Sequence, residues 1–164
     1  MSDYTEDGIK RLIDCFKAIK DTPKRDMKEE NRHRRNDMVV INSEGDEFDV
    51  FIRQSLDFAE DFSVGLVYRS KDGKRITLVR YNGQHEQSDK PFSDNPHFSY
   101  HIHRATANNL NNGRFEKHPA SITETYGSFD EAIREFMKAV CINDWQKYFP
   151  CAVNLPLFQN GVDR

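Results

Sequence analysis

Residues 62–81, FSVGLVYRSKDGKRITLVRY, decide the fold class of this protein. Two runs rich in β-branched and aromatic residues, Phe62–Arg69 and Arg75–Tyr81, flank the pair Asp72-Gly73. Such residues favour strands, and an Asp-Gly pair between two strand-like runs is a strong indication of a β-hairpin. The stretch therefore predicts two antiparallel strands joined by a tight turn.

Further strand-like runs lie on both sides of this hairpin. They are Met38–Asn42 and Phe48–Arg53 before it, and His97–Arg104 and Ala120–Tyr126 after it. Their spacing predicts an antiparallel meander, in which neighbours in sequence are neighbours in the sheet.

One helix is predicted at each end of the meander. From Thr5 to Lys20 apolar residues recur at helical spacing, and Pro23 follows the end. Ser128 and Glu131 have the spacing of a capping box, and an apolar face runs from Phe129 to Val140. The sequence thus predicts an α+β fold, a single antiparallel sheet of about five or six strands with both helices packed on one face.

The length of 164 residues suits one domain spanning 1–164. The segment 24–37 is almost entirely charged and is expected to be a solvated loop. Alternatively, its arginines form a basic edge for a phosphate backbone or an acidic partner; they are Arg32, Arg34 and Arg35. The tail, 142–164, is apolar enough that it should pack back on the body or onto a protein partner.

Net charge and composition indicate which partners and which cellular location to expect. A net charge of −3 gives no global attraction to nucleic acid or an anionic membrane, although a local basic patch remains compatible with it. No apolar run approaches the roughly 20 residues of a membrane span, and the acidic N-terminus does not resemble a signal peptide. We therefore expect a cytoplasmic protein without membrane association. Cys15 and Cys141 are expected to be buried thiols, and the oligomeric state stays open.

Histidines gather around the run from His97 to Arg104. Side chains on a strand alternate between two faces, so its aromatic and aliphatic residues should face the core. The histidines should then stand together on the other face, in solvent; they are His97, His101 and His103. Alternate residues lie about 7 Å apart, close enough to share a ligand.

Other residues are expected to complete this histidine cluster. His85 belongs to a long polar loop, 82–95, that precedes the strand and could fold over it, and Arg80 ends the strand before that loop. His33 and His118 lie in polar stretches and are expected to be ordinary surface histidines.

Imidazoles arranged in this way suit several kinds of chemistry. They act as general acid and base near neutral pH, and, when protonated beside an arginine, they hold a phosphate. Together these properties describe a metal-independent ribonuclease, with catalytic His85, His101, His103 and Arg80. Around it, the substrate would contact His97, Tyr81 and Arg104. Alternatively, His97, His101 and His103 bind a divalent transition metal.

Several short motifs resemble the TumE-type toxins of bacterial toxin–antitoxin modules, and a related group of uncharacterised bacterial proteins. The motifs are LVRYNGQH at 78–85, Pro96-His97, His101-Ile102-His103 and SFDEA at 128–132. The resemblance implies an α+β fold, a bacterial or phage-related source, and a toxin or defence role. By motif position it assigns that role to Arg80, His85, His101 and His103.

Two further functions stay open at the level of sequence. A non-catalytic module would bind a protein, such as an antitoxin or a phage protein, through segment 24–37 and the apolar tail. A metal-binding protein would use the histidines alone. RNA is the expected partner of the enzyme, and a protein is the expected partner of the module.

Overall fold

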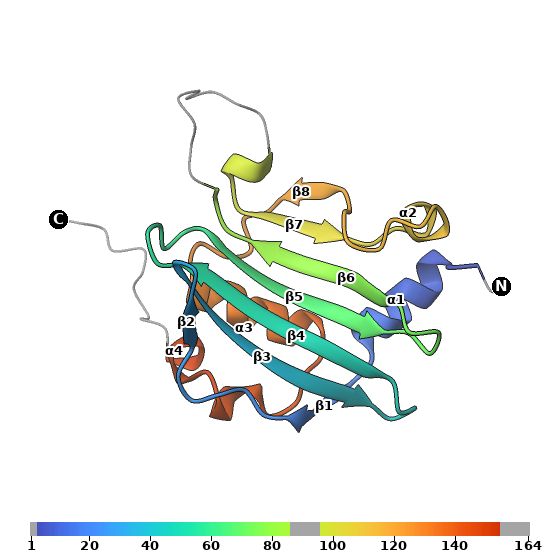
Figure 1. Ribbon diagram of the computed structural model, residues 1–164, viewed down its shortest axis with the longest axis horizontal. Helices are drawn as coiled ribbons and strands as arrows, with labels where there is room; N and C mark the ends of the chain where they lie inside the picture. The colour runs from blue at the N-terminus through green and yellow to red at the C-terminus, as the bar shows by residue number, and fades with distance from the viewer. Residues whose placement is uncertain (1–2, 86–95, 155–164) are drawn as a thin grey trace.

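The computed structural model describes residues 3–85 and 96–154. Within them, eight strands form one antiparallel sheet (Figure 1). The strands are β1 (Lys17–Asp21), β2 (Lys28–Glu30), β3 (His33–Asn42), β4 (Glu47–Ser55), β5 (Phe62–Arg69), β6 (Arg75–Asn82), β7 (His101–Arg104) and β8 (Ala120–Ile122). Across the sheet they run β1-β3-β4-β5-β6-β7-β8, and β2 also pairs with β3. The predicted antiparallel α+β fold is confirmed, but the sheet is larger than expected.

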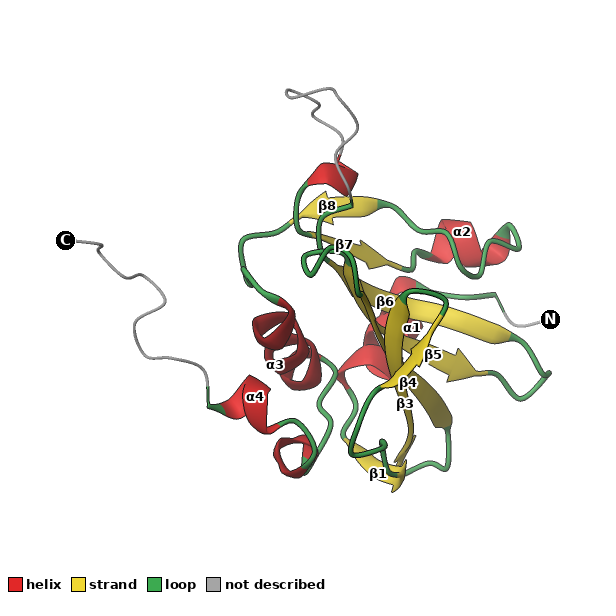
Figure 2. Ribbon diagram, turned by 60° about the vertical axis from the view of Figure 1, so that its left-hand side comes forward, coloured by secondary structure: helices red, strands yellow, loops and turns green. Residues whose placement is uncertain are grey.

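The helices leave one face of the sheet open. They are α1 (Glu6–Asp14), α2 (Ala107–Asn111), α3 (Phe129–Ala139) and α4 (Pro150–Val153), with 3-10 turns η1 (Pro96–Phe98) and η2 (Trp145–Lys147). α1 and α3 pack against the same side of the sheet, behind it in Figure 1 and beside it in Figure 2. None of the described α-helices packs across the other side, which we call the open face.

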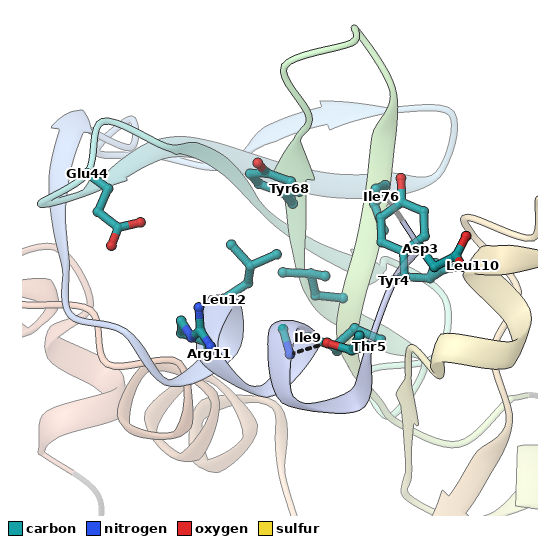
Figure 3. A pocket seen from close by; sticks show the side chains of 12 residues that line it. Asp3, Tyr4, Thr5, Ile9, Arg11, Leu12, Glu44, Tyr68, Ile76 and Leu110 are labelled. Atoms are coloured by element: carbon teal, nitrogen blue, oxygen red, sulfur yellow. Dashed lines mark hydrogen bonds between the residues drawn. The ribbon is translucent and has the colours of Figure 1, made fainter. Parts of the chain in front are cut away.

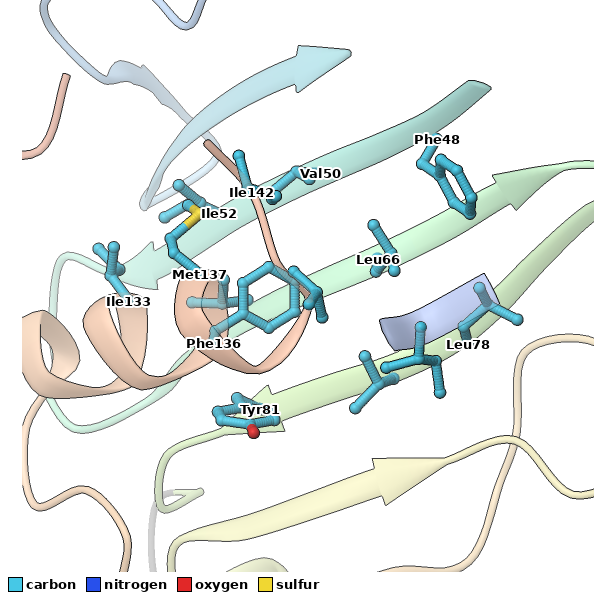
Figure 4. Close-up of a cluster of buried hydrophobic side chains, with 14 of the residues drawn as sticks. Phe48, Val50, Ile52, Leu66, Leu78, Tyr81, Ile133, Phe136, Met137 and Ile142 are labelled. Carbon is cyan, nitrogen blue, oxygen red and sulfur yellow. The ribbon is translucent and has the colours of Figure 1, made fainter. Parts of the chain in front are cut away.

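Strand alternation builds the core between the sheet and the helices. Phe136 and Met137 of α3 are fully buried against Val50, Leu66 and Tyr81 from three neighbouring strands (Figure 4). Burying side chains of this size supplies the main stabilisation of such a fold. The residues between these core positions point to the open face.

A glycine forms the turn between β5 and β6. Gly73 has φ +86°, and Ser70 N–H donates to Lys74 O at 2.8 Å, so the predicted Asp-Gly turn is confirmed. A side chain at that φ would be strained, which is why glycine stands there.

The charged segment 24–37 is not the expected loop. From Lys28 onward it forms the β2–β3 hairpin, whose turn residues Asn31 and Arg32 both have positive φ, as a two-residue type I′ turn requires. Buried Asn36 exchanges hydrogen bonds with Lys24 at 3.0 and 2.8 Å. Backbone pairing and the hydrogen bonds between Asn36 and Lys24 hold this hairpin. Because these contacts are polar, the segment shows no apolar periodicity in the sequence.

The first helix ends earlier than expected. Cys15 is extended with ψ 146°, and β1 follows at once, so the prediction of helix to Lys20 is wrong in its last part. Lys17 is 1% exposed and donates hydrogen bonds to Ile13 O, Cys15 O and Val140 O at 2.8 to 2.9 Å. Burial lowers the pKa of this lysine. One ammonium thus serves carbonyls at the ends of both α1 and α3.

Two other strands have different ends from those predicted. β7 begins only at His101, because the chain before it turns through η1, and β8 covers only the start of the predicted Ala120–Tyr126 strand. In the tail, Ile142, Trp145 and Ala152 are buried against the body; residues 155–164 lie outside the described part.

Cys15 and Cys141 are half-buried instead of buried. In the described part of the chain, no helix has the length and apolar character to cross a membrane.

Candidate functional site

The pairing of β6 with β7 brings part of the expected cluster together. Arg80 lies opposite His103, and Asn82 lies opposite His101. Tyr81, between them, lies opposite Ile102 and faces the core. Since directly paired residues point to the same side of a sheet, Arg80, His101 and His103 share the open face.

Three other expected residues do not join them as predicted. Tyr81 packs in the core, with its ring 5.3 Å from Tyr126 and 5.5 Å from Phe136. Arg104 directly follows His103 along β7, so alternation turns it to the opposite face. His97 lies in η1 and not in the strand row, and its side chain is outside the described part.

His101 and His103 are buried, which corrects the expectation that they stand in solvent. They are 0% and 6% exposed, and their rings lie 5.0 Å apart. His101 Nδ1–H donates to Ser99 O at 2.7 Å, and Asn82 Nδ2–H donates to His101 Nε2 at 3.3 Å. Their surroundings are polar, so hydrogen bonds offset the cost of burying them.

His118, expected on the surface, is a buried extension of the cluster. His103 Nδ1–H donates to His118 O, and His118 Nε2–H donates to Thr77 O, both at 2.7 Å. Burial lowers the pKa of His118, and the positive charge of Arg80 adds to this. Burial likewise lowers the pKa of half-buried Arg80. His118 therefore helps to hold β7 in place and does not lie on the protein surface.

His85 stands at the accessible edge of the histidines. Its side chain is 42% exposed, and its ring centre lies 5.6 Å from that of His101. His85 Nδ1 lies 3.3 Å from Asp61 Oδ1, so Asp61 orients the imidazole. Such a pair is the arrangement that activates a histidine as a general base.

The pair lines a cavity of about 220 Å³ on the open face. Its walls are His33, Arg53, Asp61, Phe62, Ser63 and His85. His33, at the start of β3, donates from Nδ1–H to Asn31 O at 2.9 Å, which leaves Nε2 as the ring nitrogen available to a substrate. His33, which we expected to be an ordinary surface histidine, is therefore half-buried in this wall.

Close packing at one end of the sheet places Asp61 near His85. Gly83 N–H donates to Phe62 O at 2.9 Å, and a Cβ on Gly83 would lie 1.8 Å from Glu60 O. Only glycine lets the end of β6 approach the segment before β5 so closely. Tyr126 Oη lies 2.8 Å from Asn82 O and 2.9 Å from His101 O, and its hydroxyl, which donates there, fixes the adjoining strand ends.

The described residues do not support the alternative metal site. Among them, no group of three or more histidine, cysteine, aspartate or glutamate side chains is arranged to hold a metal ion. The alternative set included His97, whose side chain is not described.

A second cavity, of about 260 Å³, lies between α1 and the core side of the sheet (Figure 3). Ile9, Leu12 and Ile76 make its floor apolar, and Gly8 N–H donates to Thr5 Oγ1 at 3.0 Å at its edge. Its lining contains no histidine, cysteine or lysine. The cavity beside His85 is therefore the better candidate for acid–base chemistry.

The sequence did not predict that four of the lining residues belong to one site; they are His33, Arg53, Asp61 and Ser63. Alternation along Phe48–Arg53 does place Arg53 on the side away from the core. Asp61 carried no such indication, because it lies in a turn whose approach to His85 depends on tertiary packing.

No protein-family model, curated protein or solved structure matches this chain.

Proposed function

We propose that this protein is a toxin-like or defence-associated enzyme that cleaves RNA without a metal ion, at the cavity beside His85. One observation carries the proposal: two histidines, His33 and His85, line the same cavity as an arginine, Arg53. Two imidazoles and a guanidinium are the groups that acid–base cleavage of a phosphodiester requires.

The proposed reaction uses the 2′-hydroxyl of RNA as an internal nucleophile. His85, held by Asp61, takes the proton from this hydroxyl, and the 2′-oxygen attacks phosphorus. His33 gives a proton to the departing 5′-oxygen as the P–O5′ bond breaks. Arg53 neutralises the charge that develops on the phosphoryl oxygens. The products are a 2′,3′-cyclic phosphate and a 5′-hydroxyl.

His101 and His103 act as positioning residues in this proposal. Both are buried and hydrogen-bonded, and the ring of His101 lies next to that of His85. They hold the wall behind His85, while Arg80, opposite His103, adds positive charge to the same face. A toxin would also need a neutralising protein partner in its host, which we propose on the resemblance to TumE-type toxins.

The test compares RNA with DNA of the same sequence. The protein should cut the RNA in the presence of EDTA, leave the DNA intact, and produce cyclic-phosphate ends detectable by mass spectrometry. His85→Ala and His33→Ala should each reduce the rate by about 100-fold or more, the usual contribution of a general acid or base. Asp61→Asn should reduce it less, because the imidazole remains.

Arg53→Gln and Arg75→Gln form a matched pair. Both arginines are exposed on the open face, but Arg75 lies at its far end, where it pairs with Asp49 at 2.9 Å. Only the first substitution should slow cleavage. RNA left intact by folded protein, or equal rates for wild type and His85→Ala, would overturn the proposal.

A further inference from the structure

An aromatic ring lies on the open face beside the cavity. Phe51 of β4 is paired with Gly65 of β5. A Cβ placed on Gly65 would lie 2.3 Å from two carbons of the Phe51 ring. The ring therefore occupies the space that a side chain at position 65 would take, and lies over the backbone of the neighbouring strand.

This ring does not belong to the hydrophobic core. Phe51 is half-buried and faces away from α1 and α3, and it is absent from the residues that make or border the core. Among the described residues, no other aromatic ring stacks on it. Its neighbours on this face are Asp37 directly opposite on β3, Asp49 and Arg53 along β4, and Arg80 across Gly65.

Positive charge is unbalanced at this end of the face. Each end carries two arginines directly opposite each other, an arrangement that destabilises a sheet unless it is compensated. At the far end, Arg69 and Arg75 are compensated by Asp49, at 2.6 and 2.9 Å, and Arg69 also by Glu47, at 2.9 Å.

At the near end, only one arginine of the pair has an ion-pair partner among the described residues. Arg35 lies opposite Arg53 and pairs with Asp37 at 3.2 Å. Within residues 3–85 and 96–154, no carboxylate lies within ion-pairing distance of Arg53. A polyanion on this face would therefore be drawn to the end that carries Phe51 and the cavity.

We infer that Phe51 is a stacking platform for an unpaired base, and that Arg35 and Arg53 bind the neighbouring phosphates. The substrate is then single-stranded RNA that crosses β3 and β4 on its way to the cavity. The inference rests on the proposed function for the identity of the substrate. A flat aromatic ring beside basic residues on an open sheet is the usual way to bind a single strand, whereas bases in a duplex are already stacked on one another.

Binding is measured with a single-stranded 2′-O-methyl oligonucleotide, which lacks the nucleophile and cannot be cut. Phe51→Leu keeps an apolar side chain but removes the ring, and should weaken binding by roughly 5- to 150-fold, as the loss of one stacked base does. Phe51→Trp should bind at least as well as wild type. Its added indole fluorescence should fall when the oligonucleotide is bound. Phe16→Leu, at a ring that is 76% exposed and lies outside the strands, between α1 and β1, should bind like wild type.

The outcomes separate this inference from the proposed function. Unchanged binding by Phe51→Leu, or equal affinity for duplex and single strand, overturns the platform even if RNA is cleaved. Binding that depends on Phe51 without cleavage of natural RNA supports the platform and overturns the enzyme. Should Phe51→Leu fail to fold, the fluorescence of Phe51→Trp decides, and an unchanged signal overturns the platform.

Discussion

At the scale of single residues, burial separates histidines that look alike in sequence. His101 is fully buried and hydrogen-bonded on both ring nitrogens, whereas His85, against whose ring it lies, is 42% exposed. An imidazole enclosed by fixed hydrogen bonds holds a structure together, while an accessible imidazole beside a carboxylate exchanges protons with a substrate. The proposed division between positioning and catalytic residues follows from this difference.

His118 should make the stability of the protein depend on pH. Burial lowers its pKa below the ordinary value of 6.5, so the unfolded chain binds the proton more tightly than the folded one. Its contribution to the free energy of unfolding is complete above pH 6.5 and is lost as the pH falls through the lowered pKa. In urea titrations at pH 7.5 and 5, His118→Gln should lose less stability on acidification than wild type.

Gln54→Ala is the control for this prediction. It removes a buried but neutral side chain, and should lower the free energy of unfolding equally at both pH values. Equal pH dependence of wild type and His118→Gln would show that burial does not affect the protonation of this residue.

At the scale of elements, the approach of two strand ends makes the candidate site. The segment after β6 carries His85, and the segment before β5 carries Asp61; they meet because Gly83 has no side chain. Neither strand alone contains an acid–base pair.

Gly83→Ala should separate these two elements. Its Cβ would meet Glu60 O, a backbone atom that cannot move without displacing Asp61. We expect a loss of about 1–3 kcal/mol in the free energy of unfolding, as for other overpacked positions. RNA cleavage should slow by about 100-fold, because small displacements of catalytic groups are costly.

Gly127→Ala is the matched control. Its Cβ would find its nearest neighbour, Glu131 Oε2, at 3.5 Å, an ordinary contact. It should leave the cleavage rate near that of wild type. Wild-type cleavage by Gly83→Ala would mean that the contact between Asp61 and His85 does not matter for the reaction.

At the scale of the whole molecule, charge is distributed unevenly over a protein whose net charge is −3. Helices cover one side of the sheet. On the open face, Arg69 and Arg75 share Asp49 at one end, whereas Arg53 at the other end has no carboxylate within ion-pairing distance among the described residues. Attraction to RNA must therefore be local and short-ranged, because salt screens it beyond about 10 Å at 0.1 M.

The salt dependence of oligonucleotide binding should report how many phosphates this face contacts. Each contact with a single strand contributes about −0.7 to the slope of log K against log salt concentration. Contacts from Arg35 and Arg53 predict a slope of about −1.4 or steeper, and Arg53→Gln should make it shallower by about 0.7.

Arg75→Gln, at the compensated end of the face, should retain the wild-type slope. If both variants change the slope equally, the RNA does not favour the end beside the cavity.

The sequence by itself determined the local features of this protein. The strand pairs of the meander, the turn at Gly73 and the capped start of α3 at Ser128 depend on neighbours a few residues away. Alternation along β7 also predicted that His101 and His103 share a face, whereas the register shift between Thr77 and Val79 of β6, which only the structure shows, places Arg80 on that face. Patterns of this kind are visible in sequence because backbone geometry repeats every two or 3.6 residues.

Only the tertiary structure decided burial and assembly. Packing against neighbouring segments buried His101 and His103. The first helix, α1, ended early, where Lys17 caps two helices. The fold also brought three residues to His85: His33, Arg53 and Asp61. These outcomes depend on how closely distant segments pack and on which polar groups then need partners. No periodicity along the chain encodes such contacts.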